Sequence, residues 1–460
     1  MPLQRNSAFR FNFKKRGFMI EPRVLKGFKD SLPENMIDKK NIIYKLESVF
    51  ESYGFVPIDT PALEYTEILL GKGGGETDKQ IYRFRDHGNR DVSLRYDLTV
   101  PLARFVSEHF NELTFPFKRY HIAPVWRGEN TQKGRYREFY QCDFDILGSS
   151  SINADIDILL TIKSGFDAIS AGDYVVNINH RKVLNGFLEK LGVKDKASDI
   201  LRTVDKIYKI GADNVVKELV ETHKIDSGIT DSIIKFLNIE KASKGRGIIG
   251  EEIFNAINDA GGAVGEDTLK YVDELETVFK TIAECGYLDR FSYNPAITRG
   301  LDYYTGIVFE SFIKDAVEFG SVCSGGRYDN LAGLYSKNEV VGVGASFGLD
   351  RLLALMESKN LLSKKSAKTE ILIFNMDNKF YPKYQKISSE LRKENINAEV
   401  FLENKKIPQQ FKYAEKKTIK YVLFAGENEI INDRYGLKNI VDGVEKKGLS
   451  IRDIIKELKG

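Results

Sequence analysis

The sequence predicts an α+β protein with two domains, the first of which carries a helical insertion. Three observations lead to this prediction. At 460 residues the chain is too long to form one compact domain. Two strand-like runs on either side of a polar loop within 117–148 predict an antiparallel hairpin. After residue 369 strand-like and helical runs alternate, which is typical of a small α/β domain with a partly parallel sheet.

The first domain is expected over residues 21–357, as an antiparallel sheet flanked by helices. Apolar residues recur on one face of a helix over 38–53, and Pro57 and Pro61 then indicate an extended segment. From about 171 to 295 helical runs separated by glycine-containing loops predict the helical insertion. Strand character returns afterwards, and the domain ends in a strand that runs into a helix. The last two segments are 299–310 and 342–357.

A polar, lysine-rich segment at 358–369 is the predicted linker to the second domain, residues 370–460. At the other end, residues 1–20 form a basic extension without acidic side chains in its first 18 positions. An organelle transit peptide and an RNA-binding arm are both compatible with that composition. We expect a disordered extension instead, because the segment has no amphipathic period.

Composition is that of an ordinary globular protein, with 42% hydrophobic and 29% charged residues. No run of 18 apolar residues occurs, so we expect no membrane span. The net charge of +3 cannot by itself predict nucleic-acid binding, so any basic surface must be local. Three cysteines lie far apart without CxxC spacing, which disfavours disulfides and zinc and favours a reducing compartment such as the cytoplasm.

Polar side chains of potential function are concentrated in the hairpin at 117–148. Alternate residues of its second run place two arginines, a phenylalanine, an amide and two carboxylates on one face: Arg135, Arg137, Phe139, Gln141, Asp143 and Asp145. Because the opposite face is more apolar, we expect this polar face to be open. Two interpretations remain: a solvated face with cross-strand ion pairs, or a sheet floor that binds an anion and a small zwitterion.

Six segments, in order, resemble the motifs of one enzyme family. They are DTPALE (59–64), LRYDLTVPLAR (94–104), the hairpin, RGLDYYTGIVFE (299–310), GGRYD (325–329) and GVGASFGLDRL (342–352). They are similar to motif 1, the amino-acid-binding segment, motif 2, two histidine-specific signatures and motif 3 of histidyl-tRNA synthetases, a class II aminoacyl-tRNA synthetase family. One match alone is a weak signal, whereas six in family order extend over most of the chain.

The resemblance implies a two-step ligase. ATP and L-histidine form histidyl-adenylate and pyrophosphate, and the histidyl group then passes to the 3′ end of tRNA(His). The family also implies Mg²⁺ as cofactor, a homodimer formed through motif 1, and an anticodon-binding role for residues 370–460. It implies no metal site made by a protein motif.

The resemblance also assigns site residues. ATP would be bound by Arg127, Glu129, Arg135, Phe139 and Arg351. Histidine would be bound by Asp97, Thr99, Arg127, Gln141, Asp145, Tyr303 and Tyr304. Arg299 and Arg127 would be catalytic, placed against the α-phosphate, because attack of a carboxylate on phosphorus depends on positioning and charge stabilisation.

A glycine-rich segment and two histidines are not predicted to take part in the chemistry. The glycine-rich GKGGGE at 71–76 lacks the spacing of a phosphate-binding loop, so we expect a mobile loop near the substrate. His121 and His180 are expected to be structural.

Two other function classes are possible for such a sequence. A non-catalytic, histidine-sensing regulatory subunit would keep the fold, but it would lose the ATP-binding arginines and the terminal domain. A synthetase-like module for RNA sensing or scaffolding is the second alternative. The presence of Arg127, Arg135, Arg299 and Arg351 favours the enzyme.

Overall fold

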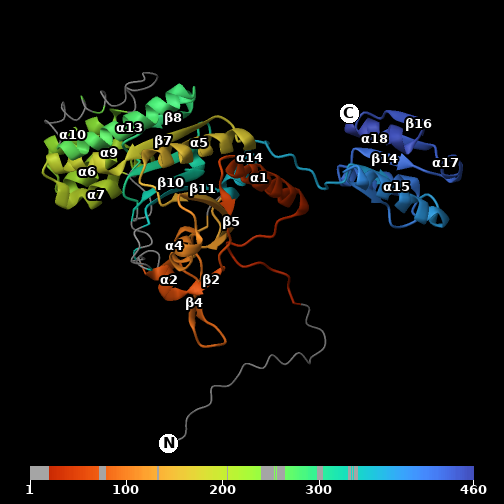
Figure 1. The fold of residues 1–460 in the computed structure, drawn as a ribbon, viewed down its shortest axis with the longest axis horizontal. Helices are drawn as coiled ribbons and strands as arrows, with labels where there is room; N and C mark the ends of the chain where they lie inside the picture. Colours follow the sequence, from red (N-terminus) through yellow and green to blue (C-terminus); the bar gives the residue numbers. More distant parts are fainter. Residues whose placement is uncertain are drawn as a thin grey trace, which may run out of the picture.

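The computed structural model describes residues 20–71, 79–131, 134–204, 206–239, 253, 255, 265–297, 304–329, 333, 335 and 340–460. Figure 1 shows a large body containing the N-terminal elements and a smaller C-terminal body, joined by the segment after α14. In the described part of the chain no helix is long and apolar enough to cross a lipid bilayer.

The large body is built on an eight-stranded sheet. Its spatial order is β1 (Val56–Pro57), β5 (Phe117–Trp126), β6 (Glu138–Leu147), β11 (Gly342–Gly348), β10 (Cys323–Tyr328), β9 (Ile307–Ile313), β7 (Tyr174–His180) and β8 (Phe291–Tyr293). The six central strands pair antiparallel, whereas β1 on β5 and β8 on β7 pair parallel at the two edges. The predicted α+β class, with its antiparallel sheet, is confirmed.

Helices cover one face of this sheet, namely α1 (Pro33–Ser52) and α5 (Ile152–Ile169), while α14 (Leu349–Ser358) follows β11. Phe50 of α1 stacks on Phe144 of β6, with 4.6 Å between the ring centroids, and Phe166 of α5 packs edge-on against Phe347 of β11. All four rings belong to one buried apolar cluster. Since side chains alternate along a strand, the residues on either side of Phe144 face away from these helices.

A compact helical region extends the sheet at its far edge. Its helices are α6 (Arg181–Lys190), α7 (Ala197–Val204), α8 (Ile207–Ile210), α9 (Ala212–Lys217), α10 (Ser227–Leu237) and α13 (Glu266–Glu284), with a π-helical turn at Glu218–Thr222. The predicted boundaries of about 171–295 were wrong, because β7 and β8 lie inside them and belong to the main sheet. The run YVVNINH of β7 alternates between apolar and polar residues only over residues 176–179, a short signal inside the predicted insertion.

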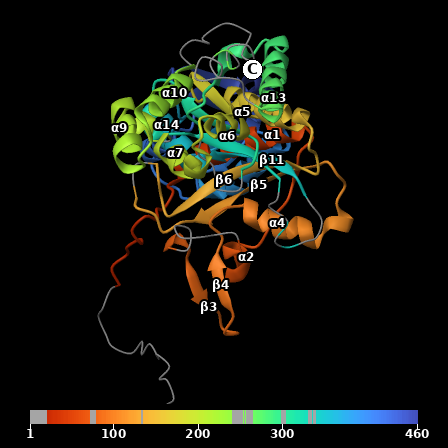
Figure 2. The ribbon, with the colours of Figure 1, turned by 90° about the vertical axis from the view of Figure 1, so that its left-hand side faces the viewer.

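A small antiparallel sheet projects from the large body, as Figure 2 shows for β3 and β4 with α2 beside them. It contains β2 (Leu63–Tyr65), β4 (Asp91–Leu94) and β3 (Arg83–Arg85), and it is accompanied by α2 (Thr66–Leu70) and α4 (Thr99–Glu108). The chain passes directly from β4 into α4 through residues 95–98, and this connection lies against the main sheet, where Arg95 donates to the carbonyl oxygen of Pro124 on β5.

The C-terminal body has a five-stranded sheet in the order β13 (Ala398–Val400), β12 (Ile371–Ile373), β14 (Tyr421–Phe424), β15 (Tyr435–Asn439) and β16 (Glu445–Leu449). The first three strands are parallel and the last two antiparallel, so the predicted partly parallel sheet is confirmed. Its helices are α15 (Tyr381–Lys393), α16 (Ile407–Lys416), α17 (Glu427–Asn432) and α18 (Ile451–Lys459).

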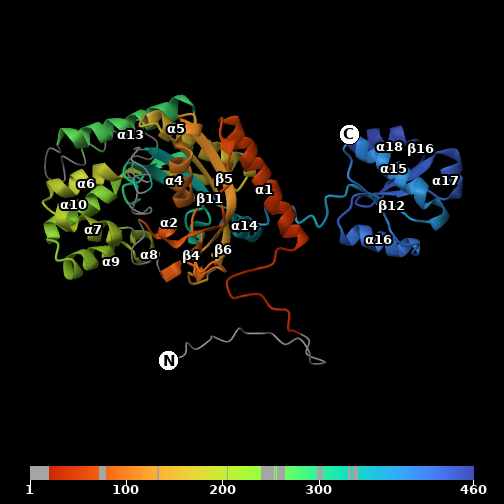
Figure 3. The same ribbon diagram turned by 60° about the horizontal axis from the view of Figure 1, so that its bottom comes forward.

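Figure 3 shows the segment between the two bodies running free of both sheets. It is attached to the large body near its middle, where the carboxylate of Asp38 on α1 accepts hydrogen bonds from the backbone N–H groups of Ser363 and Lys364 and from the Ser363 hydroxyl.

Candidate active site

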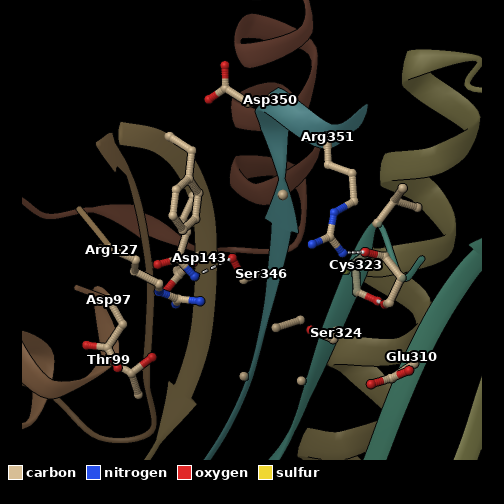
Figure 4. Close-up of a pocket in the computed structure, with 18 of the residues that line it drawn as sticks. Asp97, Thr99, Arg127, Asp143, Glu310, Cys323, Ser324, Ser346, Asp350 and Arg351 are labelled. Carbon is tan, nitrogen blue, oxygen red and sulfur yellow. Dashed lines mark hydrogen bonds between the residues drawn. The ribbon is translucent and has the colours of Figure 1, made fainter. Parts of the chain in front are cut away.

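A cavity of about 270 Å³ lies on the face of the main sheet that points away from α1 and α5. The β5–β6 hairpin, β10, β11 and the start of α4 supply its walls (Figure 4). Ten of the predicted site residues line it: Asp97, Thr99, Arg127, Glu129, Arg135, Phe139, Gln141, Asp145, Tyr304 and Arg351. Arg299, Tyr303 and nearly all of the glycine-rich loop at 71–76 lie outside the described residues.

One end of the cavity is rich in arginines. The Nε of Arg127 donates to the carbonyl oxygen of Tyr96 at 2.8 Å, and its guanidinium lies over the Phe139 ring, 5.1 Å from the centroid. The Glu129 carboxylate lies between two guanidinium groups, 3.9 Å from Arg127 and 3.7 Å from Arg135. This one carboxylate bridges two cations at distances too long for strong hydrogen bonds.

Arg351 completes the arginine end from the first turn of α14, and its Nη1 donates to the carbonyl oxygen of Ser321. Burial lowers the pKa of Arg351, and the positive charges of Arg135 and Arg127 lower it further. Repulsion among these three cations would be relieved by an anion placed between them, so this end of the cavity is suited to a phosphate chain.

The opposite end contains buried carboxylates. Asp145 accepts a hydrogen bond at Oδ1 from the Tyr328 hydroxyl at 2.6 Å, and its Oδ2 lies 2.5 Å from Nη2 of Arg119. Arg119 and Asp145 are cross-strand partners on β5 and β6, and both are buried. Burial raises the pKa of Asp145, while the charge of Arg119 and the Tyr328 hydrogen bond oppose that rise. The cross-strand ion pair that the hairpin suggested therefore exists, but it is not solvated.

Two more carboxylates face the same space. Asp97 precedes α4 and accepts a hydrogen bond at Oδ1 from the backbone N–H of Val100 at 3.1 Å. Burial raises its pKa to about 6, against the opposing effect of that hydrogen bond and the charge of Arg127. Burial also raises the pKa of Asp143 to about 7, with the charges of Asp145 and Asp97 acting in the same direction and that of Arg119 opposing them.

Glycines of the last two motifs leave β10 and β11 without side chains at two positions in the cavity wall. A Cβ atom built on Gly344 would lie 1.9 Å from Oδ1 of Asp145, and one on Gly325 would lie 2.1 Å from the carbonyl oxygen of Gly344. Neither position can accept a larger residue without moving the strands or the carboxylate. The glycines therefore allow the two strands and the Asp145 side chain to approach closely.

Comparison with protein families shows which family the chain belongs to. A family model described as histidyl-tRNA synthetase matches residues 27–352, and one described as anticodon-binding domain matches residues 370–460. The chain belongs to the histidyl-tRNA synthetase family. A histidine–tRNA ligase of Treponema denticola is 46% identical over 90% of this chain and 91% of its own length. The corresponding protein of Rhodopirellula baltica is 44% identical over 89% of this chain and 91% of its own.

Solved structures agree with the family assignment. The histidyl-tRNA synthetase of Nostoc sp. PCC 7120 superposes with a TM-score of 0.86 and 32% identity, covering 96% of this chain and 99% of that one. A Bacillus halodurans protein described as an ATP phosphoribosyltransferase regulatory subunit/histidyl-tRNA synthetase gives a TM-score of 0.69 at 20% identity, covering 89% and 99% of the two chains. At that identity the second likeness shows only that the fold is shared.

The structure corrects two expectations about the hairpin of this family member. Strand β6 begins at Glu138, so Arg135 belongs to the preceding loop and not to the strand face. The polar face was expected to be open, yet Asp143 and Asp145 are each 3% exposed. They are covered because Tyr328 of β10 and the segment that leads into α4 close over them.

The family motifs assigned no role to several residues of the cavity wall, notably Asp143, Tyr328 and Ser346. Asp143 did carry a signal, since it alternates with Gln141 and Asp145 on the same strand face. Ser346 carried none, because its place depends on the register that puts it opposite Asp143.

The two histidines singled out in the sequence lie outside the cavity wall. Nε2 of His121 is 2.9 Å from Oδ1 of Asp59, and Nε2 of His180 is 3.3 Å from Oε2 of Glu274.

Proposed function

We propose that this chain acts as a histidine–tRNA ligase, which forms histidyl-adenylate from L-histidine and ATP and then transfers the histidyl group to tRNA(His). One observation carries the proposal: a single cavity joins an arginine-lined end to an end with buried carboxylates and an amide. The first end suits the phosphates of ATP, and the second suits a ligand that carries an ammonium group and ring N–H donors.

At the arginine end Arg127 is central, because it lies between the two halves of the cavity and can meet both the α-phosphate and the histidine carboxylate (Figure 4). Arg135 and Arg351 would bind the outer phosphates, Phe139 would stack on adenine, and Glu129 would bind the adenine or its ribose. Each preorganised positive group at the reacting phosphate stabilises the transition state by about 3–4 kcal/mol, by analogy with the loss of a single oxyanion-hole donor. Arg299, assigned by the family resemblance, would add such a group.

Histidine would lie at the other end. Asp145 is oriented there by Tyr328 and Arg119, and it can accept a hydrogen bond from an imidazole N–H. Asp97, Thr99 and Gln141 would bind the amino-acid backbone, and Tyr303 with Tyr304 would close the pocket. Hydrogen-bonding side chains that are fixed in a buried site reject amino acids that cannot make the same hydrogen bonds.

Mg²⁺ belongs to the proposal as the ion that accompanies ATP. Among the described residues no group of three or more His, Cys, Asp and Glu side chains is placed to hold a metal ion. Glu129 and Glu310 line the cavity near Arg351. This donor set fits Mg²⁺, which is usually bound by one or two carboxylates together with phosphate oxygens and water. When bound, it would stabilise the charge of the leaving pyrophosphate.

The same proposal includes a cytoplasmic homodimer with anticodon binding by residues 370–460. A cytoplasmic location suits the three free cysteines. A dimer is supported by large apolar side chains that are exposed in and next to the motif 1 segment, namely Val56, Leu63 and Tyr65. Mutual burial of such side chains is what a two-fold interface provides.

Histidine-dependent exchange of labelled pyrophosphate into ATP tests the proposal, run in parallel with the other nineteen amino acids. We expect exchange with histidine alone. Absence of exchange by folded protein would refute the proposal and favour the histidine-sensing regulatory subunit, for which histidine binding would then be measured directly.

A further inference from the structure

Four buried acceptor atoms of residues that line the cavity have no hydrogen-bond partner. They are Oδ2 of Asp97, Oε1 of Gln141, Oδ1 of Asp143 and Oδ2 of Asp145. An unpaired buried acceptor is costly, so an unpaired set in one cavity indicates a ligand that supplies the missing donors. Asp97 and Asp143 lie close enough for the charge of Asp97 to raise the pKa of Asp143.

Adjacent strands hold these acceptors in place. Gln141 and Asp143 alternate on β6 and so share a face, while Ser346 lies opposite Asp143 on β11. The amide Nε2 of Gln141 donates to the Ser346 hydroxyl oxygen at 3.2 Å, and the Ser346 hydroxyl lies near enough to Asp143 to oppose the rise that burial causes in the pKa of its carboxyl. Because its NH₂ group is used in this way, the Gln141 side chain presents its Oε1 as an acceptor. Figure 4 shows Asp143 and Ser346 between Asp97 on one side and Arg351 on the other.

The neighbouring carboxylate has a different environment. Oδ1 of Asp145 accepts a hydrogen bond from the Tyr328 hydroxyl, and its Oδ2, although it makes no hydrogen bond, lies 2.5 Å from Nη2 of the Arg119 guanidinium. The other three unpaired atoms, on Asp97, Gln141 and Asp143, therefore select a ligand group with three donors that is distinct from the group facing Asp145. A primary ammonium carries three N–H donors and a positive charge, which matches two carboxylate oxygens and one amide oxygen.

We infer that Asp143 is a histidine-binding residue whose Oδ1 joins Asp97 and Gln141 in receiving the α-ammonium group of the amino acid. This inference rests on the proposed function and deepens it, because it adds a residue that the family motifs did not assign. Asp143 thereby determines specificity for amino acids over their deaminated analogues. Ser346 is a positioning residue, since it acts through Gln141 and Asp143.

The experiment compares three ligands in direct binding measurements by calorimetry on the full chain. Histidine has both the ammonium and the carboxylate, histidinol keeps the ammonium only, and imidazolepropionate keeps the carboxylate only. Asp143→Asn keeps the size of the side chain and removes its charge. We expect this variant to bind histidine and histidinol more weakly by the same factor, roughly 10- to 100-fold. Its affinity for imidazolepropionate should be unchanged.

A matched control is Asp157→Asn, which removes a carboxylate that pairs with Lys118 on β5, outside the cavity wall. It should bind all three ligands as the wild type does. Ser346→Ala should show the same ligand selectivity as Asp143→Asn with a smaller loss.

If Asp143→Asn lowered the affinity for all three ligands equally, the inference would be overturned, because Asp143 would then have a structural role or contact the imidazole ring. Unchanged histidine binding would overturn it as well. Unchanged affinity for imidazolepropionate also verifies that the variant is folded. If the wild type itself bound no histidine, the proposed function would fail rather than this assignment.

Discussion

Gly344 offers a sharp test of how the histidine end of the cavity is built. In Gly344→Ala the new Cβ would start 1.9 Å from Oδ1 and 2.4 Å from Cγ of Asp145. The carboxylate would have to retreat about 1.5 Å to reach ordinary van der Waals contact. Such a shift breaks its 2.6 Å hydrogen bond to Tyr328 and its 2.5 Å contact with Arg119.

The expected cost has two parts. Overpacking a tight core site costs about 1–3 kcal/mol, and losing a hydrogen bond to a charged group costs about 1.5–3 kcal/mol. We therefore expect the large domain to lose about 3–5 kcal/mol of unfolding free energy. Histidine affinity should fall at least roughly tenfold, because the displaced carboxylate no longer meets the imidazole.

Calorimetric melting and histidine titration measure both effects, and Gly348→Ala on the same strand is the control. A Cβ on Gly348 would meet nothing closer than the carbonyl oxygen of Val322 at 3.8 Å, so this variant should melt and bind histidine like the wild type. If Gly344→Ala also behaved like the wild type, the close approach of Asp145 to β11 would be wrong.

Three further outcomes are expected. Arg351→Ala should slow histidine-dependent pyrophosphate exchange roughly 100-fold without changing the dissociation constant of histidine, as measured by exchange kinetics and calorimetry. Asp143 has its pKa raised to about 7, so it is mostly protonated at pH 6 and must release its proton to receive an ammonium group. Histidine affinity should therefore fall about tenfold more between pH 8 and pH 6 in the wild type than in Asp143→Asn, by calorimetry at both values. Deletion of 370–460 should retain exchange and abolish efficient charging of tRNA(His), measured by aminoacylation, because the two bodies have separate apolar cores.

The main elements were predictable because their patterns are local. The helix expected over 38–53 is α1, and the alternating runs after residue 369 became β12 to β14 with α15 and α16 between them. The strand β7 was missed, because the alternation of apolar and polar residues over residues 176–179 is a short signal among longer helical runs.

The residues of the cavity also differed in how far the sequence could predict them. Arg127, Gln141 and Asp145 were singled out because they occupy motif positions, and all three line the cavity. Tyr328 orients Asp145 from two strands away in the sheet order, where β11 and β10 follow β6, and no spacing in the chain encodes that contact.

By itself, the sequence determined the family, the order of the elements and most of the residues that face the cavity. These follow from short-range periodicity and from motifs whose residues lie near one another along the chain. Only the tertiary structure decided that the hairpin face is buried and that Asp143 lacks a partner for one oxygen. Burial and hydrogen-bond pairing depend on segments distant in sequence, such as the turn before α4 and the opposite strand β11, because strand register sets which side chains meet.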